Sequence, residues 1–241
     1  MHAGVNVAEL PSVPGHYATA IIDLFFPRTC VGCGRRGELL CPDCIRQLAP
    51  VGSSCPRCGK PQAEDSVCAS CWSRTSPIDG IKSAYRFQGS ARTVIHAFKY
   101  SGLRALARPV ARLLADHLAD KPIPGSVLVA VPLHPLRLRE RGYNQSLLLA
   151  RELGRLIGMP VVDNALIRLK NTLPQVRTQD AETRLANVQG AFTCRGEQLK
   201  AVNAIILDDV CTSGATLEAC AEAMKSAGAA YVFGLTFARE I

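Results

Sequence analysis

From residue 81 onward, short apolar runs alternate with longer stretches in which apolar residues recur at helical spacing. The apolar runs predict strands over Ile81–Phe87, Val127–Val131, Val161–Leu169 (with an irregular tail), Ala191–Thr193, Val202–Leu207 and Tyr231–Phe237. The helical stretches are Ser90–Tyr100, Leu103–Leu118, Tyr143–Ile157 and Leu217–Ala227. Strands that alternate with helices indicate an α/β domain with a largely parallel sheet and helices on both faces.

Two polar stretches interrupt this alternation. Leu133–Gly142 is rich in arginine and predicts a basic loop, although its R-L-R-E-R segment also fits a surface strand or the start of an amphipathic helix. Lys170–Gln189 lacks a sustained apolar period and predicts a long loop or a short helical piece.

The first 80 residues have a different pattern and indicate a separate, small region. We expect a loosely ordered lead-in over 1–24, a cysteine-rich region over 25–75, a linker over Ser73–Gly80 and the α/β domain over 81–241. No run reaches the 18 or so apolar residues of a membrane span, and the N-terminus has no basic patch followed by an apolar core. We therefore expect no membrane insertion and a cytoplasmic protein.

Eight of the eleven cysteines form four C-x-x-C pairs, which is typical of tetrahedral zinc sites and rare in disulfide frameworks. Glycine after Cys33 and Cys58 permits the tight turn of a zinc knuckle. The simplest pairing is sequential, and an interleaved, RING-like pairing is the alternative. With four thiolates for each ion, both zinc sites are expected to be structural. The predicted ligands are Cys30, Cys33, Cys41 and Cys44 for one site, and Cys55, Cys58, Cys68 and Cys71 for the other.

The net charge of +8 is confined to the middle of the chain. Residues 81–150 carry eleven Lys and Arg against three Asp and Glu, whereas the flanking parts are balanced. A basic lobe suits pyrophosphate or single-stranded nucleic acid. Arg104, Arg108 and Arg112 fall at helical spacing, and for them a solvated helix face is favoured.

The most informative stretch is Ala204–Thr216, which reads A-I-I-L-D-D-V-C-T-S-G-A-T. A buried strand is expected to stop at Asp208 and Asp209, followed by a turn over Thr212–Thr216 and a helix. Free amides, hydroxyls and the helix N-terminus of such a turn bind phosphate, and the carboxylates can accept hydrogen bonds from sugar hydroxyls. An ordinary strand-to-helix turn with an acidic cap is the simpler interpretation of one D-D pair, but the full pattern favours a phosphorylated sugar.

A second candidate element is Val131–Gln145, V-P-L-H-P-L-R-L-R-E-R-G-Y-N-Q. It follows a strand, so it is expected at the carboxyl edge of the sheet, where open α/β folds bind ligands. Guanidinium groups suit pyrophosphate because they stay charged and bind pairs of oxygens. His134 either bonds a phosphate or acts as an acid or base, or it only positions the loop. Lys99 either reaches pyrophosphate or extends along the surface to solvent.

The D-D turn resembles the phosphoribosyl-pyrophosphate (PRPP) signature of type I phosphoribosyltransferases. Together with V-P-L-H-P…R-x-R-x-R-G-Y-N-Q, F-K-Y at Phe98–Tyr100 and the cysteine pairs, it is similar to the ComF family from about Phe25 onward. That resemblance implies a double zinc ribbon joined to a phosphoribosyltransferase-like domain, with Val131–His134 as a pyrophosphate loop often built around a strained or cis peptide. It also implies a closing hood over Thr172–Asn187, with Gln175, Arg184 and Asn187 as its recurrent polar positions.

The resemblance further implies Mg²⁺ with PRPP and two structural zinc ions. The expected partners are PRPP or a related phosphorylated ribose, single-stranded DNA in natural competence, and proteins of DNA uptake that dock on the zinc ribbon. The alternative is an active phosphoribosyltransferase with a small base or amine acceptor, in which Asp208, Asp209 and Arg141 are catalytic. A purine is disfavoured because Thr212 stands where purine-salvage enzymes have a basic aspartate. The expected PRPP contacts are Leu133, His134, Arg137, Arg139, Arg141, Asp208, Asp209, Val210, Cys211, Thr212, Ser213, Gly214, Ala215 and Thr216.

Overall fold

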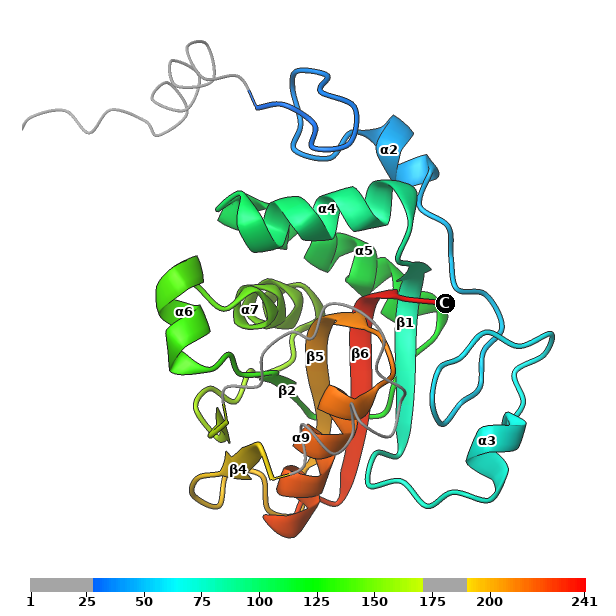
Figure 1. Ribbon diagram of the computed structural model, residues 1–241, viewed down its shortest axis with the longest axis vertical. Helices are drawn as coiled ribbons and strands as arrows, with labels where there is room; N and C mark the ends of the chain where they lie inside the picture. Colours follow the sequence, from blue (N-terminus) through cyan, green and yellow to red (C-terminus); the bar gives the residue numbers. More distant parts are fainter. Residues whose placement is uncertain (1–27, 171–189) are drawn as a thin grey trace, which may run out of the picture.

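A computed structural model describes residues 28–170 and 190–241. Its centre is a four-stranded parallel sheet in the order β1-β6-β5-β2. The strands are β1 (Gly80–Arg86), β2 (Val127–Ala130), β5 (Asn203–Cys211) and β6 (Tyr231–Arg239). The last strand of the chain thus lies inside the sheet, between β1 and β5 (Figure 1).

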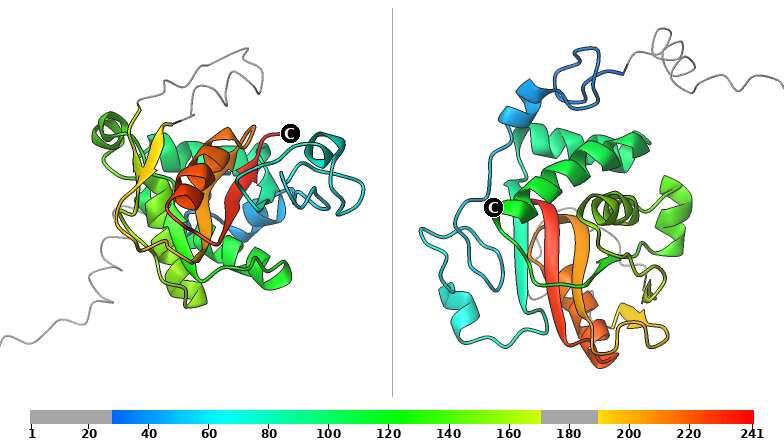
Figure 2. Two further views of the ribbon diagram at one scale, coloured as in Figure 1. Left: turned by 90° about the horizontal axis from the view of Figure 1, so that it is seen from below. Right: turned by 180° about the vertical axis from the view of Figure 1, so that it is seen from behind.

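Helices cover both faces of the sheet (Figures 1 and 2). Residues alternate between the two faces along β5, because successive strand side chains point in opposite directions. Ile205 and Leu207 belong to the hydrophobic cluster shared with α4 (Gly89–Tyr100), α5 (Ala107–Asp120) and α7 (Gln145–Ile157). Ala204 and Ile206 belong to the cluster shared with α9 (Ala215–Ser226). The predicted fold class, a parallel sheet flanked by helices, is confirmed.

The edge of the sheet beside β2 continues irregularly. Val161 forms a parallel bridge with Leu128, and the chain then enters a small antiparallel pair of β3 (Leu166–Arg168) and β4 (Phe192–Cys194). The strand predicted over Val161–Leu169 is therefore broken into a bridge and a short strand. The predicted loop over 170–189 and the implied hood residues Gln175, Arg184 and Asn187 lie almost entirely outside the described residues.

The predicted basic loop is wrong, since Pro135–Arg141 forms a helix, α6. Its ends carry ordinary helix signals: Pro135 stands at the first turn, the His134 side chain caps the N-terminus, and Gly142 closes the helix at φ 76°. The alternation of arginine and leucine obscured these signals. Because helical residues four apart share a face, Arg137 and Arg141 lie on one side of α6 and Arg139 on another.

The cysteine-rich region consists of two loops and two short helices, α2 (Pro42–Arg46) and α3 (Ala69–Trp72). The segment between the ribbons runs antiparallel to the edge strand β1: the Arg86 amide donates to Ala49 O (2.8 Å) and the Val51 amide to Ala84 O (3.0 Å). This segment covers an otherwise open sheet edge. Across the two described ranges, no helix has the length and apolar character to cross a bilayer.

Candidate functional site

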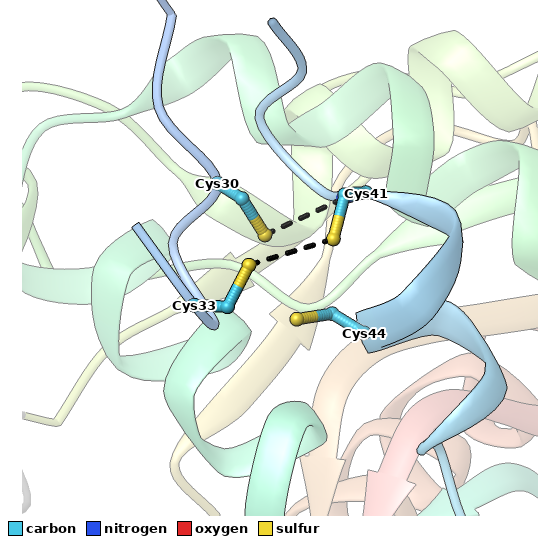
Figure 3. A group of neighbouring side chains, drawn as sticks. All are labelled: Cys30, Cys33, Cys41 and Cys44. Carbon is cyan, nitrogen blue, oxygen red and sulfur yellow. Dashed lines mark hydrogen bonds between the residues drawn. The ribbon is translucent and has the colours of Figure 1, made fainter. Parts of the chain in front are cut away.

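Each set of four cysteines converges on one point, in the sequential pairing. The four sulfur atoms of Cys30, Cys33, Cys41 and Cys44 all lie within 4.8 Å of one another, and so do those of the second set. Figure 3 shows the first set, with Cys30 and Cys33 on one loop and Cys41 and Cys44 at the start of α2. The interleaved pairing is therefore excluded.

The spacing of these sulfur atoms fits zinc. With Zn–S bonds of about 2.3 Å, a tetrahedron holds its sulfurs about 3.8 Å apart. The Sγ atoms of Cys33 and Cys41 are 3.6 Å apart, and those of Cys58 and Cys68 are 3.7 Å apart. Two Cys₄ sets with this geometry are two zinc-binding sites.

The two knuckles repeat one backbone structure. In the first, the Gly34 amide donates to Cys30 O (2.8 Å) and the Cys41 amide to Cys30 Sγ (3.4 Å). In the second, Gly59 and Cys68 make the same two bonds to Cys55, at 2.8 and 3.4 Å. Burial raises the pKa of Cys30, but the neighbouring amides outweigh it and lower the pKa to about 6. The amides thus favour the thiolate that a metal requires.

The acidic pair lies inside β5, not beyond its end as predicted. Asp208 pairs with Thr236 of β6, and the strand runs on to Cys211. The strand continues because β6 is equally long and offers ladder partners up to Arg239. Neighbouring strand residues point to opposite faces, so Asp208 and Asp209 have different surroundings.

Asp209 is buried against α4 and paired with a lysine. Its side chain is 3% exposed, and its Oδ1 lies 2.8 Å from Nζ of Lys99. Burial lowers the pKa of Lys99, but the charges of Asp209 and Asp208 outweigh it and raise the pKa above its ordinary value. The second oxygen, Oδ2 of Asp209, has no hydrogen-bond partner among the described residues. Lys99 therefore pairs with Asp209 and does not simply extend along the surface to solvent.

Asp208 receives hydrogen bonds instead of an ion pair. Its Oδ1 accepts from Ser146 Oγ (2.8 Å) and from the Asp209 amide (2.9 Å). Burial and the adjacent charge of Asp209 raise the pKa of Asp208 to about 6, against the lowering effects of Lys99 and of the two donors. Ser146 lies in the first turn of α7, so it brings a second helix N-terminus to this strand end.

The turn after β5 presents backbone amides. Gly214 adopts φ 90° and precedes α9 as its N-cap, which glycine does without strain. Ser213 Oγ accepts from the Ala215 amide at 3.4 Å. Within the described parts of the chain, the amides of Thr212, Ser213 and Gly214 have no backbone acceptor. An anion at this turn would meet both free N–H groups and the positive end of α9.

The loop after β2 leaves the sheet beside Asp208. The Val131 amide donates to Leu207 O (3.0 Å), and Val131 O accepts from Asn144 Nδ2 (3.0 Å). Asn144 also caps α7, so one side chain ties this loop to the helix that carries Ser146. None of the described peptide bonds is cis.

The arginines of α6 differ in their surroundings. Arg141 donates to Gln145 Oε1 and stacks on the Tyr100 ring, with its guanidinium carbon 5.6 Å from the ring centroid, whereas Arg139 is exposed. Arg137 is half-buried. Burial, followed by the charge of Arg137, lowers the pKa of Arg168, against the opposing effects of Cys220 and Asp208. These interactions place Arg137, Arg168 and Asp208 in one electrostatic neighbourhood.

His134 has a positioning role in α6, since its Nδ1 accepts from the Leu136 amide at 3.3 Å. Leu133 lines a cavity of about 570 Å³ between the loop after β2, α6, α7 and residues 162–168. Ser146 and Arg168 are not among the site residues predicted from the sequence. Ser146 directly follows the Y-N-Q motif, which was the one available signal, and nothing marked Arg168. Arg108 and Arg112 are exposed on α5, as predicted.

Known proteins resemble this chain in both of its parts. The family model described as "Double zinc ribbon domain" matches residues 21–72. Competence protein ComFC of Bacillus subtilis (strain 168) is 31% identical over 215 residues, which are 84% of this chain and 85% of that protein. Competence protein F of Haemophilus influenzae is 28% identical, covering 85% of this chain and 93% of the relative. DNA utilization protein YhgH of Escherichia coli (strain K12) is 28% identical, covering 80% and 87%.

Among solved structures, glutamine PRPP amidotransferase from B. subtilis, complexed with ADP and GMP, aligns with a TM-score of 0.40 at 15% identity. The alignment covers 58% of this chain and 30% of that enzyme, so the chain spans about a third of its length. The assignment rests instead on the sequence relatives and on the zinc-ribbon match. These relatives cover 80–85% of the chain, and the chain therefore belongs to the ComF family of competence protein ComFC and the DNA utilization proteins.

Proposed function

We propose that this protein binds PRPP, or a closely related phosphorylated ribose, at the edge of the sheet formed by Asp208 and the turn after β5. The observation that carries the proposal is the meeting of carboxylates and free amides at one strand end. Amides of Thr212, Ser213 and Gly214 suit the 5′-phosphate, because they are unpaired within the described residues and precede a helix. Asp208 lies in the same strand, four residues before Thr212, and suits the ribose hydroxyls.

Magnesium fits the same site. PRPP carries a pyrophosphate, and Mg²⁺ in proteins is held by one or two carboxylates together with substrate phosphates. Asp208 is the available carboxylate, since Asp209 is occupied by Lys99. A bound Mg²⁺ would supply positive charge to the pyrophosphate. Arg137 is the α6 arginine best placed to add a second cation, because it shares the electrostatic neighbourhood of Asp208 and Arg168.

We further propose that the protein handles imported, single-stranded DNA in the cytoplasm. The names of the relatives support this role, since two are competence proteins and another is a DNA utilization protein. The excess positive charge of residues 81–150 supports it physically, because exposed Arg108, Arg112 and Arg139 can neutralise phosphates. Trp72, which is 79% exposed in α3, offers one stacking surface for a base.

Calorimetry of PRPP in the presence of Mg²⁺ tests the central proposal. We expect one site for each chain in the wild type, and at least a tenfold weaker affinity in Asp208→Asn. Arg112→Gln, an exposed change on α5, is the matched control and should bind PRPP as the wild type does. Absence of heat with wild-type protein, at PRPP concentrations up to millimolar, would refute PRPP binding.

Catalytic turnover is tested separately, with the same purified protein. Pyrophosphate release from PRPP is measured with a panel of nucleobases and amines. If binding occurs without release for every acceptor, PRPP is a ligand or regulator and the DNA role stands alone. Salt-dependent retention of a fluorescent single strand then measures the DNA contribution, and Arg108→Gln/Arg112→Gln should reduce the salt slope.

A further inference from the structure

A buried arginine lies between the second zinc ribbon and the Thr212–Gly214 turn that follows β5. Arg239, at the end of β6, is 1% exposed and is among the largest fully buried side chains of the described protein. Its Nη1 donates to Sγ of Cys211 at 3.1 Å. Cys211 is the last residue of β5 and directly precedes the turn of Thr212–Gly214. A thiol is a weak, uncharged acceptor, and burying a guanidinium without an anion is costly.

The knuckle of the second ribbon lies directly against this arginine. A methyl group on Gly59 would come within 3.3 Å of Arg239 Nη1 and 2.7 Å of Ile81 O. Similarly, a methyl group on Gly80 would come within 2.7 Å of Pro56 O, so the knuckle is packed against the start of β1 without a gap. In the first ribbon the equivalent Gly34 has the same backbone conformation, φ 75° against 71°, and nothing within 4 Å of such a methyl.

The charges on the two sides of this contact are complementary. Four thiolates and one Zn²⁺ carry a formal charge of −2, and Cys58, one of the four, directly precedes Gly59. The second metal site thus supplies the anion that a buried Arg239 requires.

The chain leaving the same ribbon holds the other side of the turn. Arg74 Nη2 lies 2.6 Å from Oε2 of Glu218, and Ser76 Oγ donates to Oε1 of the same carboxylate at 3.3 Å. Glu218 is buried in the first turn of α9, and its amide donates to Gly214 O (3.0 Å). Cys211 before the turn is therefore linked to the second ribbon through Arg239, and Glu218 after the turn is linked to it through Arg74 and Ser76.

We propose that Arg239 is a positioning residue, through which the zinc site of Cys55, Cys58, Cys68 and Cys71 holds the Thr212–Gly214 turn in its anion-binding conformation. Among the described residues, the equivalent glycine of the first knuckle, Gly34, makes no comparable contact, since nothing lies within 4 Å of a methyl group there. Loss of zinc from the second site then loosens the turn and weakens ligand binding, and loss from the first does not. The ligand part of this inference rests on the proposed function, whereas the structural part does not.

The test compares the two zinc sites by hydrogen exchange. Cys58→Ser/Cys71→Ser and Cys33→Ser/Cys44→Ser should each lower the zinc content from two ions to one. Exchange of the amides of 211–217, followed by mass spectrometry without PRPP, should become at least tenfold faster in the first variant and stay within twofold of wild type in the second. Equal acceleration in both variants, or none in either, would overturn the proposal.

A glycine pair tests the same contact with both zinc ions retained. Gly59→Ala and Gly34→Ala share the cost of a positive φ, but only the first drives a methyl into Ile81 O and Arg239. We expect Gly59→Ala to weaken PRPP binding at least fivefold and Gly34→Ala less than twofold. If the wild-type protein binds no PRPP but amide exchange of 211–217 still differs between the two zinc-site variants, the proposed function fails. The link between the second zinc site and the turn then stands. If PRPP binds but the glycine variants are equal, the coupling fails alone.

Arg239 itself supplies the final comparison. Arg239→Lys keeps the positive charge facing the second metal site, and Arg239→Met keeps the volume without the charge. We expect fast exchange of 211–217 in the methionine variant and partial restoration in the lysine variant. Equal exchange in both would show that Arg239 acts only by filling space, which contradicts the electrostatic part of the proposal.

Discussion

Replacing Lys99 with methionine should destabilise the protein strongly, because it leaves Asp209 charged and buried. The Asp209 side chain is 3% exposed, its Oδ1 has Lys99 at 2.8 Å, and its Oδ2 has no partner within the described chain. Removing one member of a buried ion pair costs about 3–5 kcal/mol. Lys99 is 23% exposed, so water screens part of the interaction and we expect the lower end, about 3 kcal/mol, at pH 8.

The assay is urea unfolding followed by circular dichroism, with zinc retained, supported by the thermal midpoint. A loss of about 3 kcal/mol corresponds to a midpoint lower by roughly 6–12 °C in a chain of this size. Lys99→Met/Asp209→Asn removes both charges and should recover at least about 2 kcal/mol of the loss, since a buried pair can be replaced by neutral groups at little cost. Arg108→Met, on the exposed face of α5, is the matched control and should stay within about 0.5 kcal/mol of wild type.

Two outcomes would refute this reasoning. A cost below about 1 kcal/mol for Lys99→Met would mean that Asp209 is not buried as a charge. An additive double variant would mean that Lys99 and Asp209 do not interact, since independent sites add and coupled sites do not.

Three further predictions follow from the same structure. The pKa of Asp208 is raised from 3.8 to about 6, so the folded state binds this proton more tightly than the unfolded state does. The protonated carboxyl contributes its whole stabilisation below about pH 3.8. This stabilisation, about 3 kcal/mol, is lost as the pH rises through about 6. About 1.4 kcal/mol of this loss falls between pH 5 and 7.5, so Asp208→Asn should remove that much of the pH dependence in urea unfolding, and an unchanged pH profile would contradict it. Gly214→Ala should lower the free energy of unfolding by about 1–2 kcal/mol, because Gly214 has a φ of 90° and a methyl group there would lie 3.3 Å from Ile81 Cδ1. It should also weaken PRPP binding in calorimetry, whereas the control Gly196→Ala, also at positive φ but in open space, should leave binding unchanged. Removal of both zinc ions with a strong chelator should unfold residues 28–72, because the ribbons have few apolar residues of their own. The unfolding should appear as rapid amide exchange in these residues. Amides that stay protected from exchange without zinc would argue against a structural role of the metal.

The sequence predicted the order of elements well, because local signals and tertiary packing agree there. The apolar run before Asp208 is buried on both faces in a central strand, and the Gly34 and Gly59 knuckles form where the C-x-x-C-G motifs predicted them. For the zinc ligands, the sequence favoured the sequential pairing but could not exclude the interleaved one. Both pairings are compatible with the spacing, and only the positions of the sulfur atoms separate them.

Other parts of the site depend on contacts that a single sequence does not carry. Strand β5 extends to Cys211 because β6 pairs with it residue for residue, and no local pattern reveals the length of a partner strand. Lys99 meets Asp209 because the end of α4 packs beside β5, 110 positions later in the chain. Pro135 and Gly142 mark the ends of the helix Pro135–Arg141, but the alternating arginines favour the prediction of a loop.

The extension of β5 changes how the D-D motif works. The two carboxylates belong to one strand but have different partners, since Asp209 pairs with Lys99 of α4 and Asp208 accepts from Ser146 of α7. Asp209 is paired with Lys99, which links α4 to β5. Burial and the adjacent charge of Asp209 raise the pKa of Asp208, so a cation bound beside it would favour its ionised form. We therefore expect Asp208→Asn to weaken Mg-PRPP binding with little loss of stability at pH 7.5, and Asp209→Asn to change stability more than affinity. Equal loss of affinity in both variants would show that the strand geometry does not divide their roles.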